Sequence, residues 1–245
     1  MKIDIMTLFP EMFKETLGTS IIGNAIEKGI VDIEYTDIRE FSNNKHNKVD
    51  DYPFGGGKGM LIKAEPVYEA VMSKKKESSK VIYLSPKGKV FNQDMAIELS
   101  KEEHLILVCG HYEGIDQRAI DLCIDQEISI GDYVLTGGEL GAMVLSDAII
   151  RLLPGVLSDD ESFEIESHYN GLLEFPQYTR PRIFKDLKVP DILLSGNHKK
   201  IEEWRFKESI KATYKNRPDL LMNRKFTEEE KKVLDEIKNI RDEKK

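Results

Sequence analysis

The chain has 245 residues, of which 40% are hydrophobic and 33% charged, as expected for a globular protein of one or two domains. No apolar run approaches the roughly 18 residues of a membrane helix, and acidic residues come too early for a signal peptide, so we expect a soluble, cytoplasmic protein. Both cysteines, Cys109 and Cys123, lie in apolar stretches and are expected to be free buried thiols.

The net charge of −8 is unevenly distributed along the chain. Residues 170–245 carry 19 Lys+Arg against 14 Asp+Glu, whereas residues 1–169 carry 17 against 30. One end of the protein can therefore present a basic surface while the whole stays acidic. This asymmetry permits an RNA partner without requiring one.

The first part of the chain alternates strand-like and helix-like segments. Short apolar runs rich in Ile and Val predict strands at Lys2–Phe9, Ile30–Asp37, Lys80–Leu84, Leu105–Cys109 and near Ile128–Val134. Helical patterns fall between them, and the longest follows Gly141, where an apolar stripe ends before Pro154. The alternation predicts an α/β fold with a mostly parallel sheet covered by helices.

The composition changes after this α/β part. Residues 158–170 are rich in carboxylates and serines, lack an apolar period and predict a flexible linker between a domain over 1–157 and a smaller one over 171–245. The second domain is expected to be helical, with helices at about Lys199–Asn216 and Thr227–Asp242. Thr227 and Glu230 have the spacing of a capping box, which marks the start of the last helix.

The first of three glycine-rich segments is Asp50–Met60 (DDYPFGGGKGM). Consecutive glycines before Lys58 suggest a phosphate loop, because glycine lets backbone amides approach an anion closely. The Walker pattern, however, requires Ser or Thr after the lysine, and here Gly59 follows. A loop that holds a substrate backbone is the favoured interpretation, and a simple cluster of turns is the alternative.

The other two glycine-rich segments each follow a predicted strand. Val108–Asp116 (VCGHYEGID) lies where α/β sheets bind their ligands, and its carboxylate could accept hydrogen bonds from ribose hydroxyls or an amino group. Ser129–Met143 (SIGDYVLTGGELGAM) joins a strand to the start of a helix, whose exposed amides favour an anion or a polar ligand. Neither matches the dinucleotide fingerprint, which disfavours a plain Rossmann enzyme.

Seven phrases together resemble the bacterial tRNA (guanine-N1)-methyltransferase family in order and spacing: LFPEMF, DDYPFGGGKGM, VIYLSPKG, LVCGHYEGID, SIGDYVLTGGE, GLLEFPQYTRP and LLSGNH. The resemblance runs from Phe9 to about Asn216. It implies a SPOUT-class enzyme that transfers a methyl group from S-adenosylmethionine to guanosine 37, beside the tRNA anticodon. It further implies a homodimer with active sites shared between subunits, and a trefoil knot over roughly residues 84–140, although knots are rare in proteins.

The resemblance also implies a set of cofactor-binding residues, contributed by the three segments YLSP, CGHYEG and SIGDYVLTGG. These are Leu84, Ser85, Pro86, Gly110, Tyr112, Glu113, Ile130, Gly131, Asp132, Tyr133, Val134, Leu135, Gly137 and Gly138. One departure is Gly141, where related sequences can carry proline. Mg²⁺ is implied as a further cofactor, but the sequence shows no dedicated set of metal ligands.

Methylation of guanine N1 needs a base that removes its proton and a donor that stabilises charge on O6. Arg151 is implied as the donor, and the alternative is that it only caps the long helix. Glu166 stands where the family has an aspartate and is implied as the base. Other linker acids remain alternatives, namely Asp159, Asp160, Glu161 and Glu164.

The remaining motif positions are expected to contact the RNA substrate, with the target base flipped out of its stack. They are Asp50, Gly55, Gly56, Gly57, Gly59, Ser167, Arg180 and His198. Several basic residues of 171–245 could contact phosphates. Two other functions stay open: a non-catalytic RNA-binding relative, supported by Glu166 in place of aspartate, and a nucleotide hydrolase that uses Lys58.

Overall fold

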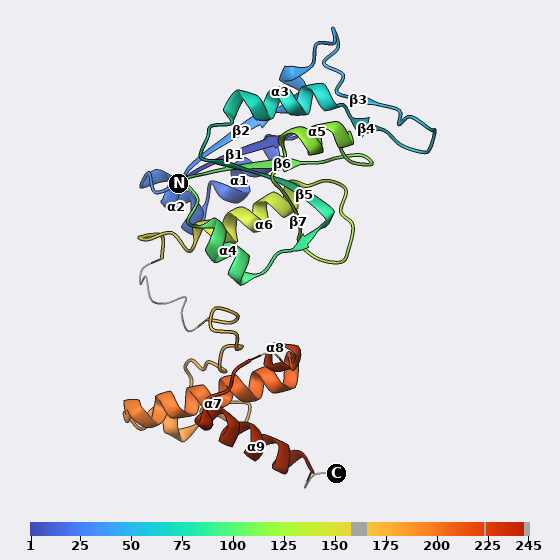
Figure 1. Cartoon of the computed structure of the whole chain (residues 1–245). Coiled ribbons are helices and arrows are strands. Elements are labelled where there is room, and N and C mark those ends of the chain that lie inside the picture. Colours follow the sequence, from blue (N-terminus) through green and yellow to red (C-terminus); the bar gives the residue numbers. More distant parts are fainter. Residues whose placement is uncertain (158–165, 223, 243–245) are drawn as a thin grey trace. The chain divides into compact units, whose positions relative to one another are not determined.

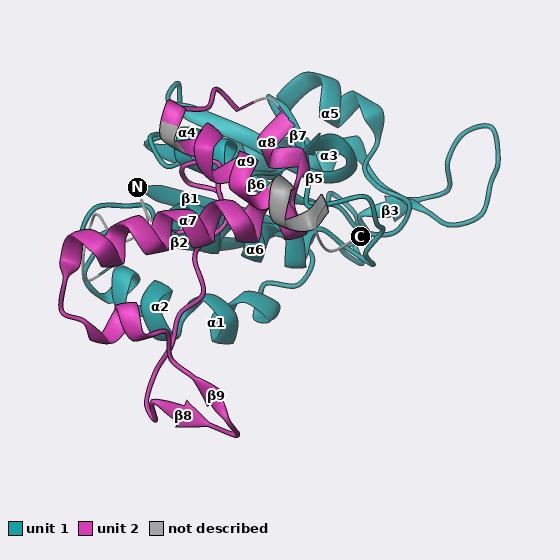
Figure 2. Ribbon diagram, turned by 90° about the horizontal axis from the view of Figure 1, so that it is seen from below, with its two compact units in different colours: residues 1–160 teal, residues 161–245 magenta. Residues whose placement is uncertain are grey.

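The computed structural model describes residues 1–157, 166–222 and 224–242. The chain divides into two compact units, residues 1–160 and residues 161–245, which Figure 2 colours separately. Most of the expected linker, residues 158–165, lies outside the described residues, and so do four of the candidate bases: Asp159, Asp160, Glu161 and Glu164.

Unit 1 is built on a five-stranded sheet of order β2-β1-β6-β5-β7, in which every neighbouring pair is parallel. Its strands are β1 (Lys2–Thr7), β2 (Asp32–Asp37), β5 (Ser79–Val90), β6 (His104–Cys109) and β7 (Gln126–Ser129). The central strand β6 is buried along its whole length. This confirms the predicted parallel sheet, whose continuous apolar strands are typical of sheets covered on both faces.

Helices cover both faces of the sheet (Figure 1). One core cluster joins Ile3 and Ile5 of β1 to α1 (Glu11–Leu17), α2 (Ser20–Glu27), α4 (Gln93–Leu99) and α6 (Glu139–Ile150). The other joins Met6 and Val108 to η1 (Ile38–Phe41), α3 (Ala64–Lys74) and α5 (Gln117–Cys123). Alternate residues of β1 point to opposite faces, so one strand supplies both cores.

A short antiparallel pair, β3 (Asp50–Asp51) and β4 (Leu61–Ile62), closes the first glycine-rich segment into a loop. The loop carries Phe54, whose side chain is almost wholly exposed. Four of its glycines have positive φ: Gly55, Gly56, Gly57 and Gly59. Such conformations strain residues with a Cβ, so the run of glycines is what allows this loop to form.

Unit 2 consists of helices around a small core, together with one hairpin. Its elements are β8 (Ile183–Phe184), β9 (Leu187–Lys188), η3 (Asp191–Leu194), α7 (His198–Asn216), α8 (Asp219–Met222) and α9 (Glu228–Asp242). The predicted capping box is confirmed: Glu230 N–H donates to Thr227 Oγ1 at 3.2 Å, and Thr227 N–H donates to Glu230 Oε2 at 2.8 Å. Val233 and Leu234 of α9 pack on Leu172 and Ile210.

The ends of two predicted strands in unit 1 were wrong. The strand expected to end at Leu84 continues to Val90. The strand expected near Ile128–Val134 ends at Ser129, because the Ser129 hydroxyl bonds both N–H and C=O of Gly131 and Gly131 has φ +148°, which turns the chain out of the sheet. The long helix begins at Glu139, within the segment expected to join a strand to a helix. Among the described residues, no helix is long and apolar enough to cross a membrane.

Candidate active site

A cavity of about 300 Å³ lies at the carboxyl ends of β6 and β7, where the pairing of β5 with β6 ends at Leu84. Three segments form its walls: residues 83–87 of β5, 110–115 and 128–138, joined by Ile120 and Gly141 from neighbouring helices. The parallel sheet brings these loops together because the carboxyl ends of its strands share one edge. The lining residues are Tyr83, Leu84, Ser85, Pro86, Lys87, Gly110, His111, Tyr112, Glu113, Gly114, Ile115, Ile120, Ile128, Ser129, Ile130, Gly131, Tyr133, Val134, Leu135, Thr136, Gly137, Gly138 and Gly141.

Close backbone packing at Gly138 sets the shape of the cavity. A Cβ at this position would lie 2.9 Å from the Cys109 Cα and 3.1 Å from the Gly110 nitrogen. Because there is no side chain, the Gly138 N–H can donate to the Gly110 carbonyl at 2.8 Å. Next to it, Gly137 and His111 form an isolated antiparallel bridge. The third loop is therefore fixed against the end of β6, with the N-terminus of α6 beside the cavity.

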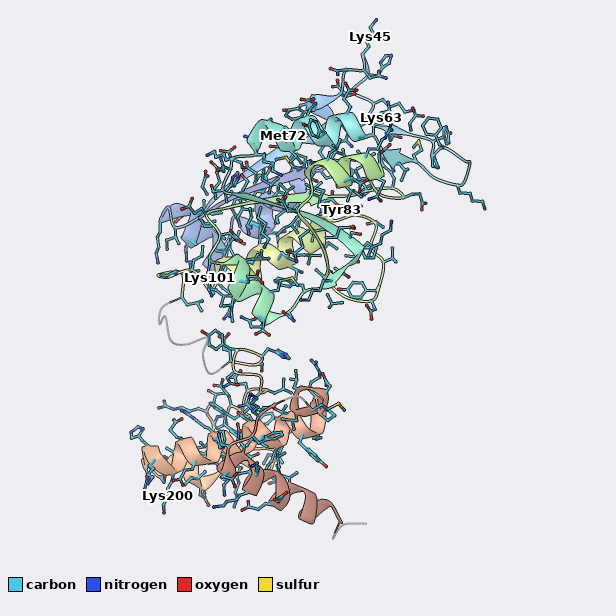
Figure 3. The ribbon with its side chains drawn as sticks, viewed as in Figure 1. Lys45, Lys63, Met72, Tyr83, Lys101 and Lys200 are labelled. Carbon is cyan, nitrogen blue, oxygen red and sulfur yellow. The ribbon has the colours of Figure 1, made fainter. Side chains whose placement is uncertain are left out.

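Tyr83 lies within β5 and lines the cavity; Figure 3 labels its place on the sheet. Its hydroxyl occupies the space where a Cβ of Gly110 would stand, 2.6 Å away. Burial, and secondarily the carboxylate of Glu127, raises the pKa of Tyr83 to about 12. The phenol is thus neutral at physiological pH and acts as a packing and hydrogen-bonding group.

The structure brings together all the residues expected to bind the cofactor except Asp132, which is not among the residues that line the cavity. Sequence reasoning missed several lining residues, most notably Lys87, His111, Ile115 and Thr136. The signal was present for His111 and Thr136, because both lie inside the glycine-rich segments already singled out. Ile120 of α5 had no such signal, since it belongs to an ordinary helical pattern.

The glycine loop over residues 55–59 packs against the same wall. Glu113 N–H donates to the Met60 carbonyl at 3.0 Å, and Ile62 N–H donates to the Gly114 carbonyl at 2.9 Å. A Cβ at Gly59 would lie 2.4 Å from the Glu113 side chain. Asp50, at the start of the hairpin, is buried. Two segments that are far apart in the sequence therefore form one continuous surface beside the cavity.

The two candidate catalytic residues belong to different compact units. Arg151 directly follows α6, where its N–H donates to the Asp147 carbonyl at 3.2 Å, and it is half-buried. Glu166 is half-buried in unit 2. Beside it, the Ser167 hydroxyl accepts a hydrogen bond from Glu174 N–H at 2.9 Å. Neither unit alone therefore contains both groups.

Arg180 lines a second cavity of about 440 Å³ in unit 2. Arg182, Tyr178, Thr179, Val189, Leu193 and Leu194 complete it. Within the part of the chain that the structure describes, neither arginine pairs with a carboxylate. His198 is the first residue of α7 and is exposed. This surface offers exposed guanidinium groups beside aromatic and aliphatic side chains.

The described residues contain no group of three or more His, Cys, Asp or Glu side chains that could hold a metal ion.

A parallel α/β sheet with a glycine-walled cavity at its carboxyl edge defines a protein of the class that binds nucleotide-like ligands there. Residues 1–223 match the family model described as tRNA (Guanine-1)-methyltransferase TrmD. The chain therefore belongs to the tRNA (guanine-N1)-methyltransferase family, and the resemblance read from its seven phrases is confirmed.

Curated relatives carry the same description over nearly the whole chain. A tRNA (guanine-N(1)-)-methyltransferase of Dictyoglomus turgidum is 56% identical over 238 residues, covering 97% of both chains. That of Alkaliphilus oremlandii is 57% identical over 247 residues, covering 98% of this chain and 99% of its own. That of Ruminiclostridium cellulolyticum is 58% identical over 223 residues, covering 90% and 96%.

Proposed function

We propose that this chain transfers the methyl group of S-adenosylmethionine to N1 of guanosine 37 in tRNA. The observation that carries the proposal is the cavity itself, where residues 83–87 and two glycine-rich loops, 110–115 and 128–138, converge at one edge of a parallel sheet. Membership of the methyltransferase family supplies the reaction class. The proposal disfavours the nucleotide hydrolase, because Gly55–Lys58 lies in a β3–β4 hairpin loop and not between a strand and a helix N-terminus.

The residues of the cavity suit an adenosine-like ligand. The glycines leave backbone amides and carbonyls accessible, as at Gly138 and Gly110, and Leu84, Ile130 and Leu135 add apolar surface for a flat base. We assign methyl-donor binding to the residues implied by the resemblance. Asp132 is included among them, although it does not line the cavity. When bound, S-adenosylmethionine supplies a methyl group on a cationic sulfur, which leaves as a neutral thioether.

We propose that the knot lies where the chain leaves β7. Because β5 stands between β6 and β7, residues 130–138 must cross the end of β5 to reach Gly110. Residues 85–88 bulge out of the sheet before Lys89 and Val90 pair again with Ile128 and Ser129. This crossing supports a knot over roughly residues 84–140.

The chain's own residues are assigned the acid–base work. Guanine N1 carries a proton and becomes nucleophilic only as that proton leaves. In our proposal the Glu166 carboxylate accepts the N1 proton while the Arg151 guanidinium donates to O6, where negative charge develops. N1 then gains the methyl group. Glutamate retains the carboxylate of the family's aspartate and extends its reach by one methylene.

A homodimer would bring Arg151 of one subunit to Glu166 of the other. Helices α1 and α6 of unit 1 pack on each other, and both expose apolar side chains that are about half accessible, namely Met12, Leu140 and Val144. Leu140 and Val144 are four residues apart and lie on one helix face. We propose that a second copy of the chain covers this surface, since exposed apolar patches commonly mark interfaces.

We assign tRNA binding to unit 2 and to the glycine loop of residues 55–59. The carrying feature is the second cavity, lined by Arg180 and Arg182, because guanidinium groups that pair with no carboxylate among the described residues are available to bind phosphate. Ser167, His198 and Asp50 complete the proposed substrate contacts. We also propose a cytoplasmic location, where tRNA is modified, and a requirement for Mg²⁺, which chelation by EDTA would test.

The function is tested with labelled S-adenosylmethionine and two tRNA transcripts that differ only in guanosine or adenosine at position 37. Methyl transfer to the first transcript alone, mapped to N1, is the expected result. Glu166→Gln and Arg151→Ala should each lose most of the transfer yet bind S-adenosylhomocysteine as the unchanged protein does. Wild-type protein that binds tRNA but transfers nothing would favour the non-catalytic relative. Retained transfer in both variants would remove the assigned mechanism.

A further inference from the structure

Three segments that are far apart in the sequence meet beside the cavity through Thr7, His111 and Glu139. The Thr7 hydroxyl donates to Glu139 Oε1 at 2.8 Å and accepts from Phe9 N–H at 2.9 Å, so one carboxylate oxygen is fixed at the end of β1. The other oxygen, Oε2, lies 3.9 Å from His111 Nδ1. The Glu139 side chain is buried and belongs to the first turn of α6, where the helix dipole stabilises a negative charge.

The His111 ring is held by packing rather than by hydrogen bonds. Its ring centroid lies 5.1 Å from that of Phe9 and 5.3 Å from that of Tyr112, which it meets edge-on. Nδ1 is buried without a hydrogen-bond partner among the described residues. Nε2 is not among the buried unpartnered atoms, and His111 lines the cavity. The ring therefore points Nδ1 toward Glu139 and exposes its other nitrogen.

The surrounding charges favour one tautomer of His111. Glu139 is the ionisable group that faces Nδ1, and its carboxylate attracts a proton there. The Arg39 guanidinium lies 5.2 Å from the centroid of the Phe9 ring, which packs on His111, and Glu113 is two residues away in the same loop. With the proton on Nδ1, Nε2 carries a lone pair and can only accept a hydrogen bond.

Gly137 makes this arrangement possible. A Cβ there would lie 2.2 Å from Glu139 Oε2 and 2.5 Å from His111 Nδ1. Any side chain would force the carboxylate and the imidazole apart. The backbone at Gly137, which forms part of the cavity wall, therefore packs directly against the His111–Glu139 pair. A shift of this backbone must move the two side chains, and the reverse also holds.

We propose that His111 is a positioning residue for the methyl donor, oriented by Glu139 so that its Nε2 accepts a hydrogen bond from the donor bound in the cavity. The ammonium group, the ribose hydroxyls and the adenine amino group of such a ligand are its hydrogen-bond donors. This inference rests on the proposed function, and it goes beyond it by giving a role to a side chain that neither acid–base catalysis nor the resemblance uses.

Two substitutions test the two ring nitrogens of His111 separately, because the amide group of asparagine lies near the position of Nδ1 and that of glutamine lies near the position of Nε2. The readout is the Kd of S-adenosylhomocysteine, measured by isothermal titration calorimetry on the full chain. His111→Asn should weaken binding about tenfold, the usual cost of one ligand hydrogen bond, while His111→Gln should stay within about threefold. His46→Gln, at an exposed loop histidine, is the matched control and should leave Kd unchanged.

Glu139→Gln provides an independent measurement if His111→Asn fails to fold. Its amide can donate to Nδ1, which forces the proton onto Nε2 and removes the acceptor, so binding should weaken as in His111→Asn. Equal losses in the asparagine and glutamine variants would reduce His111 to a packing role and overturn the inference, as would unchanged binding in both. Wild-type protein that does not bind the ligand at all would instead overturn the proposed function.

Discussion

Replacing Gly138 with alanine is expected to weaken methyl-donor binding strongly, although only one methyl group is added. The new Cβ would lie 2.9 Å from the Cys109 Cα and 3.2 Å from the Leu84 Cβ. Both neighbours belong to paired strands of the sheet, β6 and β5, and cannot move aside as a flexible side chain would. The loop must therefore move, which stretches the bond from Gly138 N–H to the Gly110 carbonyl.

Overpacking of this kind typically costs about 1–3 kcal/mol. If the strain is relieved by displacing the cavity wall, it corresponds to about a 5- to 150-fold weaker Kd for S-adenosylhomocysteine. Calorimetric titration measures this loss, and thermal unfolding of the same samples shows whether the fold is retained.

Gly141→Ala is the matched control in the same segment. A Cβ at this position meets the Leu84 Cδ1 at 3.3 Å, the far end of a flexible side chain, and alanine is favoured over glycine in a helix by about 1 kcal/mol. Its Kd should stay within about twofold of wild type. A Gly138→Ala protein that binds as tightly as Gly141→Ala would refute the view that close backbone packing shapes this cavity.

Three further predictions concern other parts of the chain. Hydrogen bonds and charge from Lys2 and Lys74 hold the pKa of Glu34 at about 2, so its stabilising contribution is complete above the ordinary value of 4.5 and is lost as pH falls toward 2. Glu34→Gln should therefore lower the free energy of unfolding by about 1 kcal/mol or less near neutral pH. In urea unfolding, the difference in stability between the variant and the wild type should disappear in acid. A difference that is independent of pH would contradict the assignment. Thr227→Ala removes one half of the capping box and should lower the unfolding free energy of unit 2 by about 1 kcal/mol, whereas an unchanged value would show that Glu230 alone caps α9. Arg180→Gln and Arg182→Gln should each weaken tRNA binding and lower the log–log salt slope by about one, while Arg205→Gln, whose guanidinium already pairs with Glu202 at 2.7 Å, should have little effect.

Local patterns in the sequence were enough to predict the elements and the positions of the loops. Apolar runs located all five strands of the parallel sheet, although β5 runs past its predicted end and β7 stops short of its own, and the spacing of Thr227 and Glu230 located the start of α9. Glycine-rich segments after β6 and β7 marked the walls of the cavity. These features are readable because burial periodicity and capping depend on residues only a few positions apart.

The arrangement of those loops was decided only by long-range packing. Nothing in the local pattern shows that β5 stands between β6 and β7, or that the 128–138 loop returns to Gly110. Thr7 and Glu139 are 132 positions apart, and their hydrogen bond exists only because β1 and α6 pack around one core. The role proposed for His111 likewise depends on Glu139, which only the tertiary structure brings near its Nδ1, 28 positions along the chain.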